Sequence, residues 1–83
     1  MARAPLGATV TLTVNSWDGE RPVEGDFLRT ETGRCYRIEF IRWRQRGART
    51  VATFRCRVLE DDAVRFGEPG VWGWAWASRN RAA

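Results

Sequence analysis

The sequence predicts an all-β domain, a small SH3-like or OB-like barrel or sandwich of about five antiparallel strands. Short segments in which apolar and polar residues alternate recur along the chain, which is the pattern of strands with one buried face. Clusters of Gly, Pro, Asn and Asp separate them about every ten residues, and no helical periodicity extends beyond a turn or two. A length of 83 residues fits one domain, and closure into a barrel would remove exposed strand edges.

Residues 1–7 are expected to be a flexible lead-in, residues 8–77 the β-barrel domain, and residues 78–83 a short basic tail. The first strand is expected over residues 8–14, with valine and leucine on one face and threonine on the other. Turn-forming residues 15–22 then predict a loop. Trp17 in this loop is interpreted as a lid over one end of the core, with an exposed contact as the alternative.

The next three strands are expected at residues 27–30, 35–44 and 50–59. Residues 31–34 predict a tight turn in which Gly33 supplies a positive φ angle. The apolar pattern predicts that Tyr36, Ile38 and Phe40 lie opposite residues 58, 56 and 54 on the core face. This register centres a loop with an odd number of residues on Gly47.

The same register has consequences for the outer face and for the cysteines. Cys56 should face the core and Cys35 should face away from it, so no intramolecular disulfide is expected, and reduced thiols fit an intracellular origin. Glu39 should lie opposite Arg55, and Arg37 opposite Arg57. Because opposed like charges are unfavourable, an anion or an acidic partner could bind at Arg37, Arg55 and Arg57, although screening by Glu39 and solvent is the simpler interpretation.

Residues 71–77 alternate tryptophan with glycine and alanine, which predicts a strand with an indole ladder on one face and an almost bare opposite face. The ladder consists of Trp72, Trp74 and Trp76. It could pack against the chain's own core or a subunit contact, or it could be a stacking platform for single-stranded nucleic acid. Sugar binding is a weaker alternative.

The predicted hairpin tip at residues 42–49 combines one tryptophan with four arginines: Trp43, Arg42, Arg44, Arg46 and Arg49. It could be an exposed, solvated tip. Alternatively it could contact phosphate or an acidic groove, since arginine next to an aromatic residue is typical of nucleic-acid contacts and of interface hot spots.

The composition argues against an enzyme. Histidine and lysine are absent, which removes the commonest general base and the lysine nucleophile. Two cysteines alone cannot form a structural zinc site, so we expect no metal and no cofactor. The one acidic cluster, at residues 60–62, is interpreted as a solvated turn, and the chain has no recognisable phosphate-binding loop or RNA-recognition motif. We expect no small-molecule substrate.

All 14 basic residues are arginine, and the net charge is +4. Codon usage in a GC-rich, actinobacterial-type host or one of its viruses is one explanation; selection for the contacts that guanidinium groups make with phosphate and carboxylate is another. The charge permits nucleic-acid binding without demanding it. No apolar run resembles a membrane span or a signal peptide, so we expect a protein of the host cytoplasm or of a virion, with no membrane partner.

The stretch from Gly25 to Ile38, in which Gly-Asp precedes a short strand, a glycine turn and a Tyr-containing strand, resembles small β-barrel proteins of tailed bacteriophages. These include head-completion and tail-adaptor proteins. The resemblance implies a non-enzymatic structural or adaptor protein of the virion that binds other virion subunits or itself as a homo-oligomer. In that case Trp43 and the tryptophan ladder would anchor the interface. The alternative is a small nucleic-acid-binding barrel that uses tryptophan stacking and arginine–phosphate contacts.

Overall fold

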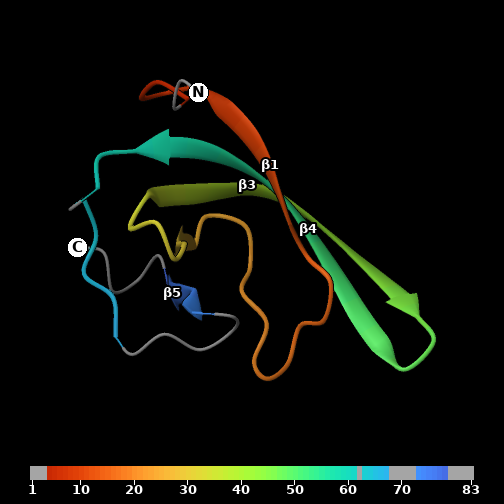
Figure 1. Ribbon diagram of the computed structural model, residues 1–83. Coiled ribbons are helices and arrows are strands. Elements are labelled where there is room, and N and C mark those ends of the chain that lie inside the picture. Colours follow the sequence, from red (N-terminus) through yellow and green to blue (C-terminus); the bar gives the residue numbers. More distant parts are fainter. Residues whose placement is uncertain (1–3, 62, 68–72, 79–83) are drawn as a thin grey trace.

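The computed structural model describes residues 4–61, 63–67 and 73–78, and this part of the chain is all-β. It contains five strands: β1 (Thr9–Val14), β2 (Phe27–Arg29), β3 (Cys35–Arg46), β4 (Arg49–Leu59) and β5 (Ala75–Ala77). They form one antiparallel sheet in the order β1-β4-β3-β2-β5 (Figure 1). The predicted fold class and strand number are therefore confirmed. No helix among the described residues is long and apolar enough to span a membrane.

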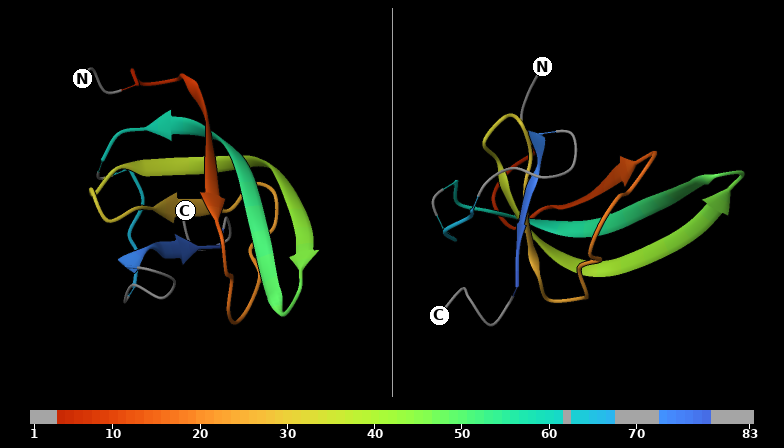
Figure 2. Two further views of the ribbon diagram at one scale, coloured as in Figure 1. Left: turned by 45° about the vertical axis from the view of Figure 1, so that its right-hand side comes forward. Right: turned by 90° about the horizontal axis from the view of Figure 1, so that it is seen from below.

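The sheet does not close into a barrel. Among the described strands, β1 pairs only with β4 and β5 pairs only with β2, so these two strands are the edges. Figure 2 shows that the long β3–β4 hairpin bends away from the short strands β2 and β5. The distal half of the hairpin and the short strands β2 and β5 thus lie at different ends of a strongly twisted sheet.

A β-bulge in β3 divides the hairpin into two registers. Ile38 lies opposite Cys56 as predicted, but Phe40 lies opposite Arg55, which leaves Glu39 as the extra residue. The predicted pairing of Phe40 with Phe54 is therefore wrong, because Ile41 takes that place. Beyond the bulge, the two faces of β3 are exchanged relative to straight pairing. Side chains expected on the outer face point to the core, and side chains expected in the core point outward.

The bulge also shortens the predicted loop. Arg46 pairs directly with Arg49, so the connection consists of Gly47 and Ala48 alone, and not of an odd number of residues. Gly47 has φ of 61°, which suits a two-residue hairpin turn. The positive φ predicted for Gly33 is likewise present, at 86°.

The main core lies on one face of the sheet and is centred on Phe54. This side chain is fully buried and meets the indoles of Trp17 and Trp43 edge-on, at centroid distances of 5.6 and 6.1 Å. Trp17 is 7% exposed, and its backbone N–H bonds to the carbonyl of Thr50 while its indole Nε1–H donates to the carbonyl of Glu20. Trp17 is therefore the lid over the core that the sequence favours.

A second, smaller apolar cluster covers part of the opposite face. Cys35, Val64 and Ala77 are buried there, with Phe27, Leu59 and Phe66 packed around them. Cys35 thus faces away from the main core as predicted, yet it is fully buried because residues 64–66 cover this end of the sheet. Both cysteines are free, and they belong to different clusters.

The bulge predicts different costs for two phenylalanines of the same hairpin. Phe54→Ala should lower the free energy of unfolding by about 3–5 kcal/mol, because a fully buried ring is lost. Phe40→Ala should cost about 1 kcal/mol or less, because this ring is 43% exposed. Chemical denaturation of both variants measures the difference, and equal losses would contradict the bulged register.

Candidate functional site

Seven arginines share the outer face of the β3–β4 hairpin, which we call the basic face. Residues directly opposite each other in an antiparallel pair point to the same side, so the observed register assigns them together. On β3 the alternation resumes after the bulge, which brings the arginines of its distal half to the side that holds Arg37. The basic face consists of Arg37, Arg42, Arg44, Arg46, Arg49, Arg55 and Arg57.

This face unites two sites that the sequence suggests separately. The tip arginines lie on one continuous surface with Arg37, Arg55 and Arg57. The bulge at Glu39 causes this, because it turns the β3 arginines of the tip toward the outer face. Straight pairing would have put Arg42 and Arg44 on the core face. The sequence pattern does not predict that these arginines share one face, because the alternation of apolar and polar residues does not reveal the bulge.

Glu39 balances the inner end of the basic face. Its carboxylate accepts a hydrogen bond from Nε of Arg57 at 3.0 Å and lies 3.8 Å from Nη2 of Arg37. Arg37 and Arg57 do lie opposite each other as predicted. Glu39, however, pairs with Arg57 rather than lying opposite Arg55, because it is the bulged residue. The chain thus supplies the anion between these two arginines, and no external one is required there.

Phe40 is the aromatic residue of the basic face, and the sequence-based selection missed it because the straight register buried it. The guanidinium of Arg55 lies over its ring, 5.3 Å from the centroid. Phe40 and Arg55 line a shallow hollow of about 330 Å³ whose other walls are Thr11, Arg42, Arg44 and Thr53. The hollow combines an exposed aromatic ring, two hydroxyls and three guanidinium groups.

Positive charge is concentrated here beyond what the net charge of the chain suggests. Seven arginines and Glu39 give the face a net charge of +6, whereas the whole chain carries +4. The remainder of the chain is therefore net negative. Among the described residues, the carboxylate ion pairs of this face are those of Glu39, so the arginines of the tip are left to solvent or to a partner.

Trp43 does not share the surface of its neighbouring arginines. It lies opposite Ala52 on the core side, 5.9 Å from Trp17, and the guanidinium of Arg21 lies 4.6 Å above its ring. Trp43 is therefore not part of the surface that Arg42 and Arg44 form, although the sequence groups all three in the hairpin tip. The bulge sends Trp43 to one face and the two arginines to the other.

The tryptophan ladder is also directed toward the core. Trp74 and Trp76 are partly buried against the main cluster, while Ala75 and Ala77 are each only 4% exposed on the other face. The small side chains of this other face leave room for the second cluster, which packs against Ala77. Gly73 has φ of 79°, so the extended strand does not include it, and Trp72 lies outside the described residues.

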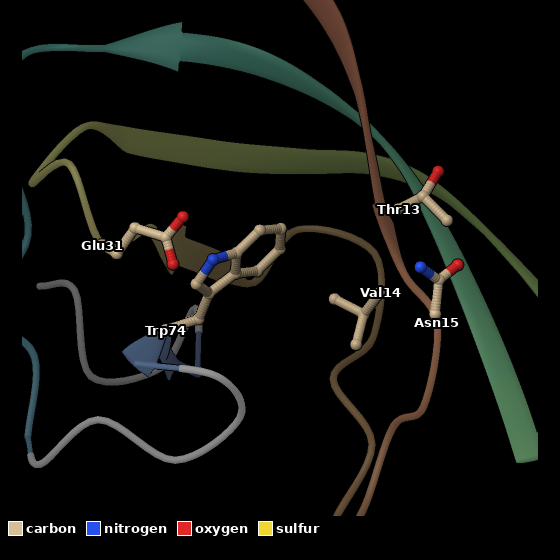
Figure 3. A pocket seen from close by; sticks show the side chains of 5 residues that line it. All are labelled: Thr13, Val14, Asn15, Glu31 and Trp74. Carbon is tan, nitrogen blue, oxygen red and sulfur yellow. The ribbon is translucent and has the colours of Figure 1, made fainter.

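Trp74 occupies the gap between the two edges of the sheet. Figure 3 shows its indole between the side chains of Glu31 and Val14. These residues, with Thr13 and Asn15, line a pocket of about 200 Å³. The pocket is small, and Trp74 is one of its walls, so we interpret it as the place where barrel closure is incomplete.

Comparison with known protein families, curated proteins and solved structures finds no match for this chain. Among the described residues, no three His, Cys, Asp or Glu side chains are grouped so that they could hold a metal ion. The basic face is therefore the candidate functional site, on its geometry and charge alone.

The two thiols should be unreactive in the folded protein. Burial, reinforced by the nearby Glu39 carboxylate, raises the pKa of Cys56 to about 12, and burial also raises the pKa of Cys35. Since an unfolded thiol ionises near pH 9, the unfolded state gains stability from ionisation above that pH. The free energy of unfolding should fall as the pH rises from 9 toward 12, and less steeply in Cys56→Ala. Denaturant titrations across this range measure it, and identical slopes for both proteins would contradict the burial of Cys56.

Proposed function

We propose that this chain is a non-enzymatic binding protein whose basic face binds the phosphate backbone of nucleic acid. The proposal rests on the collection of seven arginines on one sheet face, with Glu39 as the single carboxylate among the described residues of that face. Arginine suits this role because its planar guanidinium donates two parallel hydrogen bonds to a phosphate.

The spacing of the arginines supports a backbone contact. Arg42, Arg44 and Arg46 alternate along one strand, so their Cα atoms repeat at about 6.7 Å, twice the rise per residue. This repeat is similar to the distance between neighbouring phosphates of an extended nucleic-acid strand. Arg49 and Arg55 on β4 add a second, parallel row of guanidinium groups.

Phe40 supports single-stranded nucleic acid in particular. An exposed ring within a row of arginines can stack an unpaired base, an interaction worth about 1–3 kcal/mol per base. The hollow beside Phe40 has room for such a base, and Thr11 and Thr53 place hydroxyls at its walls. This stacking site replaces the tryptophan ladder, whose described members pack against the chain's own core.

The second candidate is a structural or adaptor protein of a phage virion that binds other virion subunits. The observation in its favour is the edge of β1, which no other strand in the described part of the chain extends and to which a strand of another protein could pair. Partly buried Trp43, Trp74 and Trp76 are less suited to anchor that interface than the sequence suggests. A salt-resistant complex with a protein partner, with no affinity for oligonucleotides, would favour this candidate.

Binding of a short, mixed-sequence single-stranded oligonucleotide tests the nucleic-acid proposal. The logarithm of the binding constant should fall linearly with the logarithm of salt concentration, and Arg42→Gln combined with Arg44→Gln should reduce the slope by about 1.4, or 0.7 per lost phosphate contact. Fluorescence anisotropy over a series of salt concentrations measures both slopes.

Arg21→Gln is the control for a positive charge outside the basic face, because it removes one charge, against two in the double variant, from the side of the sheet where Arg21 covers Trp43. It should leave the slope unchanged. No binding at low salt, or an equal change of slope in the control and the double variant, would contradict the proposal.

A further inference from the structure

Strand β1 presents a free row of backbone hydrogen-bonding groups. Its register with β4 pairs Val10, Leu12 and Val14 with residues 56, 54 and 52, and Val58 donates its N–H to the carbonyl of Ala8. Because hydrogen-bonded and non-hydrogen-bonded pairs alternate in an antiparallel ladder, the even-numbered residues exchange bonds with β4. The N–H and C=O groups of Thr9, Thr11 and Thr13 therefore point outward, where no described strand pairs with them.

This edge lacks the usual protection against pairing. Natural sheets block exposed edges with charged residues, proline, bulges or very short strands. The six residues of β1 are threonine, valine and leucine, without charge, proline or glycine. The other edge, β5, has only three residues. The chain carries 14 arginines, yet none lies on the edge strand β1 itself.

We propose that β1 pairs antiparallel with β1 of a second copy of this chain, with Thr11 on the two-fold axis. Thr9 then lies opposite the partner's Thr13, and Val10 opposite the partner's Leu12. Three threonine pairs exchange two backbone hydrogen bonds each, about six in total. This proposal does not depend on the proposed function.

The side chains of β1 favour a second copy as the occupant. The strand is self-complementary in this register, because threonine meets threonine on one face and valine meets leucine on the other. Val10 and Leu12 are only partly buried although they pack against the main core, and the partner's strand covers both. An acidic or basic strand from another protein would find no opposite charge on β1.

Electrostatic repulsion between the two basic faces does not prevent this pairing. Arg55 lies opposite Thr11 on the neighbouring strand, so Arg55 and its counterpart are separated by three strand spacings, roughly 14 Å. That distance exceeds the Debye length of about 8 Å at physiological ionic strength. The two-fold axis places both basic faces on the same side, where they form one wider positive surface.

Thr11→Pro tests the edge directly. It removes the outward N–H at the centre of the pairing and leaves the hydrogen bonds to β4 intact, a position at which proline is tolerated on an edge strand. We expect a dimer in sedimentation equilibrium of the wild type and of the control Thr11→Val, and a dissociation constant at least about tenfold higher for Thr11→Pro. A wild type that stays monomeric at every concentration, or a dimer that Thr11→Pro leaves unchanged, would overturn the proposal.

A charge pair at the same position tests the register, and it also covers the case in which Thr11→Pro does not fold. The Thr11→Glu protein and the Thr11→Arg protein should each be monomeric on its own, because like charges meet on the two-fold axis. An equal mixture of the two proteins should dimerise, because opposite charges then meet there. Near-ultraviolet circular dichroism checks that each variant is folded. If the mixture dimerises no better than its components, Thr11 does not lie on the axis and the proposed pairing is wrong.

Discussion

The β-bulge at Glu39 is the constraint on which the two-sided character of this small sheet depends. One extra residue between Ile38 and Phe40 shifts the hairpin register. It directs Ile41 and Trp43 into the core, where Trp43 packs edge-on against Phe54. The same shift directs the arginines of the distal strand outward. Without the bulge, guanidinium groups would have to enter the apolar core around Phe54, at a large desolvation cost.

The segments that pack on each face of the hairpin determine how much of that face is exposed. The core face is closed by the loop that carries Trp17, and the proximal part of the outer face is closed by Val64 and Phe66. What stays open is the distal outer face, where arginines gather around Phe40 and the hollow beside it. Glu39 stands at the border and neutralises Arg37 and Arg57. Positive charge available to a partner is therefore concentrated toward the hairpin tip, beside the uncharged edge of β1.

Much of this fold can be predicted from local sequence patterns, and its departures have identifiable causes. Alternation predicts the long strands well, and glycine predicts the turns at Gly33 and Gly47, since both depend on neighbouring residues only. The bulge buries Ile41 and Trp43 in place of Phe40, and this depends on tertiary packing. The alternation of apolar and polar residues does not show which of these side chains is buried. The arginines of the basic face can therefore be listed from the sequence, but their union into one face, the ion pairs of Glu39 and the position of Phe40 cannot. The tryptophan ladder suggested a contact surface because alternation shows that Trp74 and Trp76 share a face, but not that this face packs against a core formed by residues distant in sequence.

The measurement that tests this account most directly is the cross-strand register of the hairpin in solution. Nuclear Overhauser effects between backbone protons of the isotopically labelled protein identify which residues lie opposite each other. We expect contacts of Ile41 with Phe54 and of Trp43 with Ala52. Contacts of Phe40 with Phe54 and of Arg42 with Ala52 would mean an unbulged hairpin. In that case Arg42 and Arg44 would not lie on the same face as Arg55 and Arg57, which would contradict the account.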